Sequence, residues 1–178
     1  SNASWEAQTS FSDNIVGKNG GAVLVFNESS VSWEAPTSFS GNSAGKSGGA
    51  LLVEYRSNAS WEADTDFLRN HAASNGGAVS IGSSVSGNEE SSSSLVINGK
   101  TTFLRNTCEA RGGGMAIISA ASATIQTGES VTFTENSADV AGGAVFVSGV
   151  GMGPQFVGIS FISNSAHIGG AVYVTGSG

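Results

Sequence analysis

Several kinds of residue are scarce in this chain of 178 residues, and each shortage excludes some classes of structure or function. There is one cysteine, Cys108, so no disulfide bond can form within the chain. The cysteine count therefore does not indicate whether the protein lies in an oxidising or a reducing compartment. Charged residues make up 12%, about half of the usual share. Lys and Arg number 7 against 14 Asp and Glu, which gives a net charge of −7. Because nucleic acids and anionic membranes attract basic surfaces, we expect neither as a partner.

Long apolar runs and helical periodicity are also missing. No stretch approaches 18 apolar residues, so the sequence predicts no transmembrane segment here, and it shows no signal peptide. No window keeps a 3.6-residue period, and recurring glycine pairs would break any helix. The two histidines, His71 and His167, have no cysteine beside them at zinc-ligand spacing. We therefore expect no metal, no cofactor and negligible α-helix.

What the sequence does contain is one segment repeated six times. The copy at 39–53, FSGNSAGKSGGALLV, begins with phenylalanine, has asparagine three residues later, and ends in a Gly-Gly pair followed by a short apolar run. The phenylalanines are 28, 28, 36, 30 and 28 residues apart. Repetition at a nearly fixed period is typical of stacked repeats rather than of one compact core. The copies begin at Phe11, Phe39, Phe67, Phe103, Phe133 and Phe161.

The residues before each phenylalanine alternate with a period of two, which indicates a strand. Val31, Trp33 and Phe39 share one parity, and the polar residues of VSWEAPTSF mostly share the other. Short strands at a fixed period without helices between them favour a parallel β-helix, because residue n then stacks on residue n+28 about 4.8 Å away. We predict an all-β solenoid of about six coils with ~28 residues per coil, with the phenylalanines and the apolar run inside.

Three more columns of like residues fit this stack. Stacked amides can hydrogen-bond from coil to coil, so we expect the asparagines to form a ladder. The position two residues later holds only small side chains, including Ala44 and Cys108, and is expected to point into a crowded corner. The Gly-Gly pairs suit a bend that needs positive φ or a close backbone approach. The asparagines are Asn14, Asn42, Asn70, Asn106, Asn136 and Asn164.

The pairing of Gly-Gly-Ala-[Ile/Leu/Val] with Phe-x-x-Asn resembles the repeat of the chlamydial polymorphic outer-membrane proteins, and it extends from about Phe11 to Val174. Two departures are GGGM at 112–115 and a last copy that is one residue shorter before its Gly-Gly pair. The resemblance implies a right-handed β-helix in a surface or passenger region, with adhesion as the family role. It carries over no catalytic residue.

Two columns outside that motif are candidate binding surfaces. Glu6, Glu34 and Glu62 would stack as like charges, either solvated on an outer face or bridged by Ca²⁺, and solvation is favoured because no other ligand type repeats beside them. The tryptophans that precede them share parity with the phenylalanines, which favours the interior. A turn between tryptophan and phenylalanine would instead permit an exposed aromatic platform. These tryptophans are Trp5, Trp33 and Trp61.

The 36-residue spacing predicts a protruding loop at 82–94. Insertions in a solenoid often form the binding face, so Asn88, Glu89 and Glu90 are also candidate binding residues. A flexible serine-rich excursion is an equal alternative. We interpret residues 1–3 as a remnant of an expression tag and 4–178 as a single β-helix that is a piece of something longer.

These features favour a non-catalytic segment of an extracellular or cell-surface protein. It would act in adhesion to a protein or glycan of a host or neighbouring cell, or as a rigid spacer, and its open coil edges would allow end-to-end self-association. One alternative is a β-helical polysaccharide lyase or uronan epimerase, which needs Asp, Lys and Arg gathered in one groove. A second is an ice-binding solenoid, which needs an unbroken Ser/Thr array. In the column before phenylalanine, Asp66 interrupts such an array.

Overall fold

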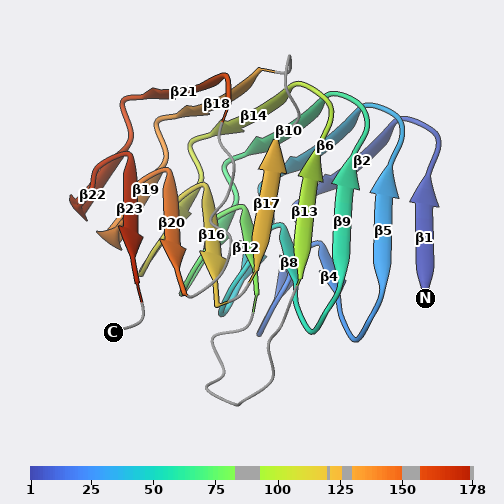
Figure 1. Cartoon of the computed structure of the whole chain (residues 1–178), viewed down its shortest axis with the longest axis horizontal. Coiled ribbons are helices and arrows are strands. Elements are labelled where there is room, and N and C mark those ends of the chain that lie inside the picture. The colour runs from blue at the N-terminus through green and yellow to red at the C-terminus, as the bar shows by residue number, and fades with distance from the viewer. Residues whose placement is uncertain (83–92, 120, 126–129, 150–156, 177–178) are drawn as a thin grey trace.

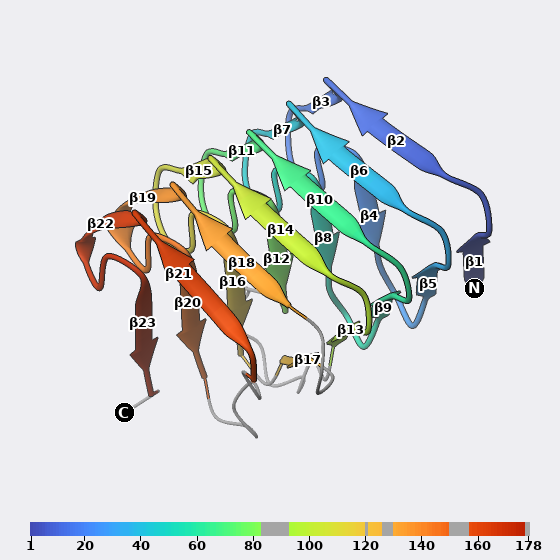
Figure 2. The ribbon, with the colours of Figure 1, turned by 90° about the horizontal axis from the view of Figure 1, so that it is seen from above.

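The chain winds into a parallel β-solenoid. The structure is a computed structural model, and it describes residues 1–82, 93–119, 121–125, 130–149 and 157–176. Figures 1 and 2 show the chain rising through one sheet on the near side, crossing away from the viewer through a second, and descending behind through the last as it advances from the N-terminus to the C-terminus. That path is a right-handed coil, the usual hand for parallel crossovers.

Successive coils contribute strands to four parallel sheets, which we name A to D in chain order. Sheet A contains β1 (Asn2–Trp5), β5 (Ser30–Trp33), β9 (Asn58–Trp61), β13 (Ser94–Ile97) and β17 (Ser122–Ile125). Sheet B contains β2 (Thr9–Ser12), β6 (Thr37–Ser40), β10 (Thr65–Leu68), β14 (Thr101–Leu104), β18 (Val131–Thr134) and β21 (Ile159–Ile162).

Sheets C and D complete the coil. Sheet C contains β3 (Ile15–Val16), β7 (Ser43–Ala44), β11 (His71–Ala72), β15 (Thr107–Cys108), β19 (Ser137–Ala141) and β22 (Ser165–Ile168). Sheet D contains β4 (Val23–Val25), β8 (Leu51–Val53), β12 (Val79–Ile81), β16 (Met115–Ile118), β20 (Val145–Ser148) and β23 (Val172–Thr175). Three sheets have six strands and sheet A has five among the described residues, so these complete about five turns where about six coils were expected.

The register places equivalent residues of successive repeats opposite one another. Phe39 pairs with Phe67 and Phe67 with Phe103, although 28 residues separate the first pair and 36 the second. The missing residue of the last repeat produces a register shift between β19 and β22, where Ala138 pairs with Ala166 but Ala141 pairs with Ile168. Differences in repeat length are therefore absorbed between strands or at this bulge, and the stacking of the phenylalanines is preserved.

The core is a single apolar column along the solenoid axis. The phenylalanine rings stack with centroids 4.4 to 5.4 Å apart, and the four inner ones are fully buried. The first and third residues of the sheet D strands, such as Leu51 and Val53 in β8, pack against these rings. The predicted interior is confirmed. The described part of the chain contains no helix that is long and apolar enough to cross a membrane.

Candidate functional site

The asparagines form the predicted ladder at the corner between sheets B and C. The backbone N–H and the Nδ2 of Asn42 both donate to Oδ1 of Asn70, each at 3.0 Å. Nδ2 of Asn70 donates in turn to Oδ1 of Asn106 and back to the carbonyl oxygen of Phe39, again at 3.0 Å. The same bonds recur from Asn14 to Asn164. Each inner side chain is fully buried with its amide satisfied, so the ladder holds every corner in one conformation.

The residue before each asparagine makes the bend itself. It adopts a positive φ of 53° to 64° in all six coils, and only one of the six residues is glycine. The side chains of this column differ from coil to coil. Arg105 and Glu135 form an exposed ion pair there, whose hydrogen bond raises the pKa of Arg105 and lowers that of Glu135. The residues are Asp13, Gly41, Arg69, Arg105, Glu135 and Ser163.

The two glycines of each pair are required for different structural reasons. The first has positive φ, 68° at Gly48 and 67° at Gly76, which L side chains rarely adopt. The second lies against the next coil, so a Cβ on Gly49 would overlap the carbonyl oxygens of Gly77 and His71. Both reasons suggested by the sequence therefore apply, one to each glycine.

The small-residue column is buried behind the asparagine ladder. Ala72, Cys108 and Ala138 are at most 3% exposed and pack together. Burial raises the pKa of the Cys108 thiol to about 12. The thiolate, which is the nucleophilic form, is therefore scarce at neutral pH, and Cys108 acts as a small apolar side chain.

The tryptophans lie inside, which removes two of them from the candidate binding surface. Trp33 and Trp61 are fully buried, and Trp5 in the first coil is partly buried against the same core. The chain does turn a corner between β5 and β6, so the alternation from Val31 to Phe39 spans two strands rather than one. The turn does not expose the indole, because Trp33 packs edge-on against Phe39 with ring centroids 5.5 Å apart.

The glutamates lie at that corner, exposed to solvent. Oε1 of Glu34 accepts a hydrogen bond from Ser4 Oγ at 3.0 Å, and Oε2 of Glu62 accepts one from Asn98 Nδ2 at 2.6 Å. In the next coil, Asn98 occupies the position that corresponds to these glutamates. Among the described residues, no group of three His, Cys, Asp or Glu side chains could hold a metal ion. The exposed carboxylates with hydroxyl and amide partners fit the solvated alternative.

The loop predicted at 82–94 falls mostly outside the described residues, and Asn88, Glu89 and Glu90 lie in that part. At its ends, Gly82 has a φ of 87°, and Ser93 Oγ accepts a hydrogen bond from the backbone N–H of Ser57 at 3.3 Å. Its position is between β12 and β13, the return from sheet D to sheet A.

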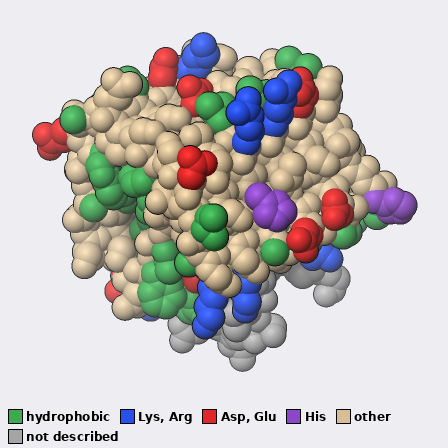
Figure 3. Space-filling view, turned by 180° about the vertical axis from the view of Figure 1, so that it is seen from behind, with side chains coloured by type: hydrophobic (Ala, Val, Ile, Leu, Met, Phe, Trp, Pro, Cys, Tyr) green, Lys and Arg blue, Asp and Glu red, His purple; other side chains and the backbone are tan. Residues whose placement is uncertain are grey.

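One groove of about 440 Å³ contains two carboxylates, Asp64 and Asp66, on the outer side of sheet B. No lysine or arginine lines it, although the register places Lys100 next to Asp64 in the following coil. Figure 3 shows acidic, basic and histidine side chains scattered over the face opposite to that of Figure 1. This groove thus lacks the Lys and Arg side chains that a β-helical lyase combines with Asp.

A second groove involves residues that the sequence interpretation did not single out. It has a volume of about 550 Å³ and lies along the outer side of sheet D, where Phe26, Glu54 and Tyr55 form part of its wall. A signal for it was present, because Phe26 and Tyr55 come one and two residues after the ends of sheet D strands, at positions outside the repeat motif. Aromatic residues without a place in the repeat pattern are candidates for the surface.

Comparison with known proteins agrees with the repeat. Residues 8–25, 36–54 and 130–148 match the Chlamydia polymorphic membrane protein repeat. Each match covers the sheet B, C and D strands of one coil, with the asparagine corner and the glycine pair, and leaves out sheet A. No curated protein and no solved structure matches the chain. This chain is a parallel β-solenoid in which three segments match the Chlamydia polymorphic membrane protein repeat.

Proposed function

We propose that this solenoid is a non-catalytic segment of an extracellular or cell-surface protein, in which it presents a side face for adhesion to a protein or glycan of another cell. The observation that carries the proposal is the match of three of its segments to the Chlamydia polymorphic membrane protein repeat. Stacking supports it physically, because each coil needs only its neighbours and adds about 4.8 Å of length.

The arrangement of the ladders supports a rigid presenting surface. The asparagine and phenylalanine columns run through all six repeats without a break. The side chains that face outward from sheet B differ from coil to coil, as in Ser38, Asp66 and Thr102. A ligand would therefore meet a fixed backbone that carries replaceable side chains.

Attachment of the labelled chain to cultured cells, and to immobilised glycans and surface proteins, tests the adhesive role. Saturable binding by the folded chain that disappears after heat denaturation is the expected result. Absence of binding from every surface would leave a rigid spacer as the role of this segment and would reject adhesion. Turnover of alginate, pectin or another acidic polymer would reject the non-catalytic proposal.

The chain should also associate with itself. Among the described residues, sheets B, C and D have a strand without a second neighbour at each end, and apolar residues near these edges are exposed, Ile15 by 82% and Val174 by 67%. Exposed edges pair readily with other strands. Sedimentation analysis across a concentration series should therefore show head-to-tail oligomers, and a strictly monomeric chain at high concentration would contradict this.

A further inference from the structure

The groove on the outer side of sheet D is lined by residues of four successive coils and has a buried floor. Leu52 and Ser80 are the middle residues of β8 and β12, and each is 1% exposed although it points away from the core column. One wall comes from the turns between sheets C and D, at Lys46 and Ser74, and the other from the turns between sheets D and A. A volume of about 550 Å³ is in the range of about 300–1,000 Å³ found for ligand sites.

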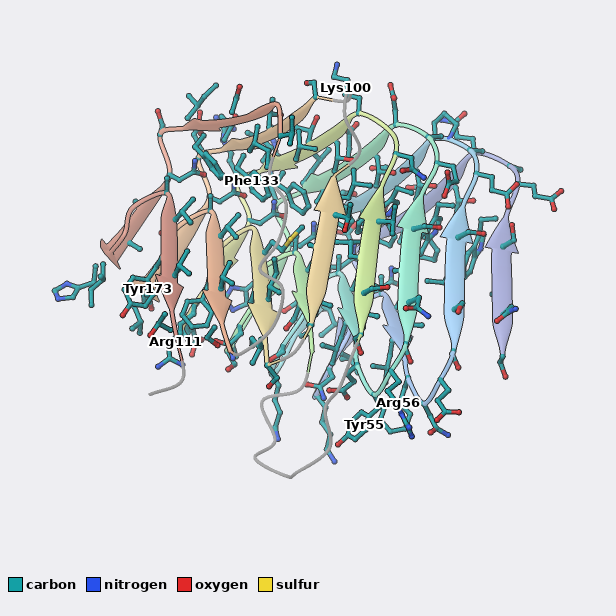
Figure 4. All side chains as sticks on the ribbon, in the orientation of Figure 1. Tyr55, Arg56, Lys100, Arg111, Phe133 and Tyr173 are labelled. Atoms are coloured by element: carbon teal, nitrogen blue, oxygen red, sulfur yellow. The ribbon has the colours of Figure 1, made fainter. Side chains whose placement is uncertain are left out.

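The wall between sheets D and A presents two aromatic rings. Phe26 and Tyr55 have ring centroids 4.7 Å apart and planes inclined by 59°, and they remain 45% and 37% exposed. Figure 4 shows Tyr55 and Arg56 projecting together from the edge where the chain returns to sheet A. Arg56 forms an ion pair with Glu28 of the preceding coil at 2.8 Å, which ties the two turns together. The exposed rings therefore lie beside an ion pair that joins two neighbouring turns.

Tyr55 adopts a backbone conformation that tyrosine rarely takes. Its φ is 57°, and Arg56 next to it also has a φ of 57°. A bulky residue in the left-handed region costs about 1–3 kcal/mol and persists where its surroundings hold it. Here the turn to sheet A directs this ring towards Phe26 instead of into the core.

Polar groups in the groove have unused hydrogen-bonding capacity. Among the described residues, the carboxylate of Glu54 has no hydrogen-bond or ion-pair partner, and partial burial raises its pKa. The hydroxyl of Ser80 is buried in the floor and finds no partner within the described part of the chain. Buried polar atoms in folded proteins nearly always have a partner, protein or water. The floor of this groove thus contains an unpaired hydroxyl, and its wall presents a partly exposed carboxylate that a ligand can bond.

This combination fits a neutral sugar better than an ion or an apolar ligand. Lys46 and Glu54 carry opposite charges, so the groove does not select for a net charge. Exposed aromatic faces pack against the C–H face of a pyranose ring, while carboxylate, ammonium and hydroxyl groups bond its hydroxyls. An open groove on the side of a rod also admits an inner residue of a chain, which an enclosed pocket would not.

We propose that the sheet D groove binds a neutral sugar residue of a glycan, with the Tyr55 and Phe26 rings against the sugar and Glu54 and Lys46 bonded to its hydroxyls. The proposal deepens the adhesive function above and rests on it. It places the binding face on sheet D, on the side of the rod where the return to sheet A begins.

The test uses the whole chain against immobilised neutral oligosaccharides of glucose, galactose, mannose and N-acetylglucosamine, with alginate and hyaluronate oligomers for comparison. The best neutral binder is then titrated by calorimetry. Tyr55→Ala should weaken binding between about three- and tenfold through loss of the stacked ring. Glu54→Gln, which keeps the shape of the side chain, should weaken it about tenfold through loss of charge-assisted hydrogen bonds.

Tyr173→Ala is the matched control. Tyr173 is a sheet D aromatic residue that stacks on Phe146 at the other end of the solenoid, and it does not line the groove. This variant should bind like the unaltered chain, and circular dichroism should show all three variants folded.

Each other outcome overturns the proposal in a different way. Sugar binding that both groove variants leave unchanged would place the glycan site elsewhere and keep adhesion. Preference for the acidic oligomers would reject the ligand class. Attachment to cells through a protein, with no sugar bound, would reject the sugar site and keep adhesion, whereas no attachment of any kind would reject both.

Discussion

The corner between sheets B and C has a constant length, whereas the return from sheet D to sheet A varies in length. In all six coils two residues separate the sheet B strand from the sheet C strand, and the second of them is the ladder asparagine. The return has four residues between β8 and β9 but twelve between β12 and β13. The family repeat matches the first region and not the second.

Side-chain bonding explains the difference. At the corner, each inner asparagine side chain bonds a backbone N–H and a carbonyl oxygen of the preceding coil and the side-chain amide of the next coil. An added or missing residue would therefore leave buried polar groups unpaired in two coils. At the return, coils are joined mainly by backbone hydrogen bonds that any residue can make, such as Glu54 N–H to the carbonyl oxygen of Val25 at 3.0 Å. A solenoid can therefore vary its binding residues at the return without loss of register.

Gly77→Ala should have the largest effect on stability. The new Cβ would overlap the carbonyl oxygens of Gly113 and Thr107. Both oxygens belong to the backbone of the next coil, so they cannot move away unless that coil is displaced. We expect a loss of more than about 4 kcal/mol in the free energy of unfolding. Urea denaturation followed by circular dichroism measures it. Gly17→Ala is the control, because nothing lies within 4 Å of its added Cβ, and equal losses for the two variants would refute close coil packing.

Asn70→Ala should cost about 3 kcal/mol, because it leaves the buried N–H of Asn42 and the carbonyl oxygen of Phe39 without their partners. Asn58→Ala is the matched change in sheet A, where the exposed side chain accepts one hydrogen bond from Ser94, and it should cost less than about 0.5 kcal/mol. Thermal and urea unfolding would compare them. Similar losses would mean that the ladder contributes no more than a surface contact.

Trp33→Ile should cost about 2 kcal/mol, less than a truncation to alanine would. The reason is that Ile97 already occupies the same column, two coils further on, where it is fully buried. The indole nitrogen of Trp33 also has no hydrogen-bond partner among the described residues, so its removal loses no such bond. Unfolding midpoints would report the change. A loss as large as that of Asn70→Ala would show that sheet A depends on its residues as strictly as the corner does.

Deletion of residues 84–91 should have the smallest effect. It restores the 28-residue spacing and keeps Ser93, whose hydroxyl accepts the hydrogen bond from Ser57. Shortening a connection changes its closure entropy only slightly, so we expect a change below about 0.5 kcal/mol. Unfolding curves of the two chains should overlap. A deletion that unfolds the protein would show that this return is part of the structure.

Much of the fold could be predicted because the repeat is visible in the sequence. Equivalent columns such as Asn42 with Asn70 follow from the spacing once a parallel stack is assumed, and the small size of Ala72 and Cys108 reveals the crowded side. The tryptophans show where the sequence becomes ambiguous. Parity favoured burial of Trp33, but the same pattern spans a corner that parity alone does not reveal.

The candidate groove could not be predicted in the same way. Its members come from separate coils and from turns outside the motif, and no spacing in the chain marks Phe26, Lys46 and Ile118 as members of one groove. The sequence by itself determined the coil length, the parallel stack and the residues of the inner columns, because those properties repeat and each copy confirms the others. Only the tertiary structure decided which outward side chains share a surface, because the corners between four sheets set the direction of each side chain, and no residue type encodes the angle of a corner.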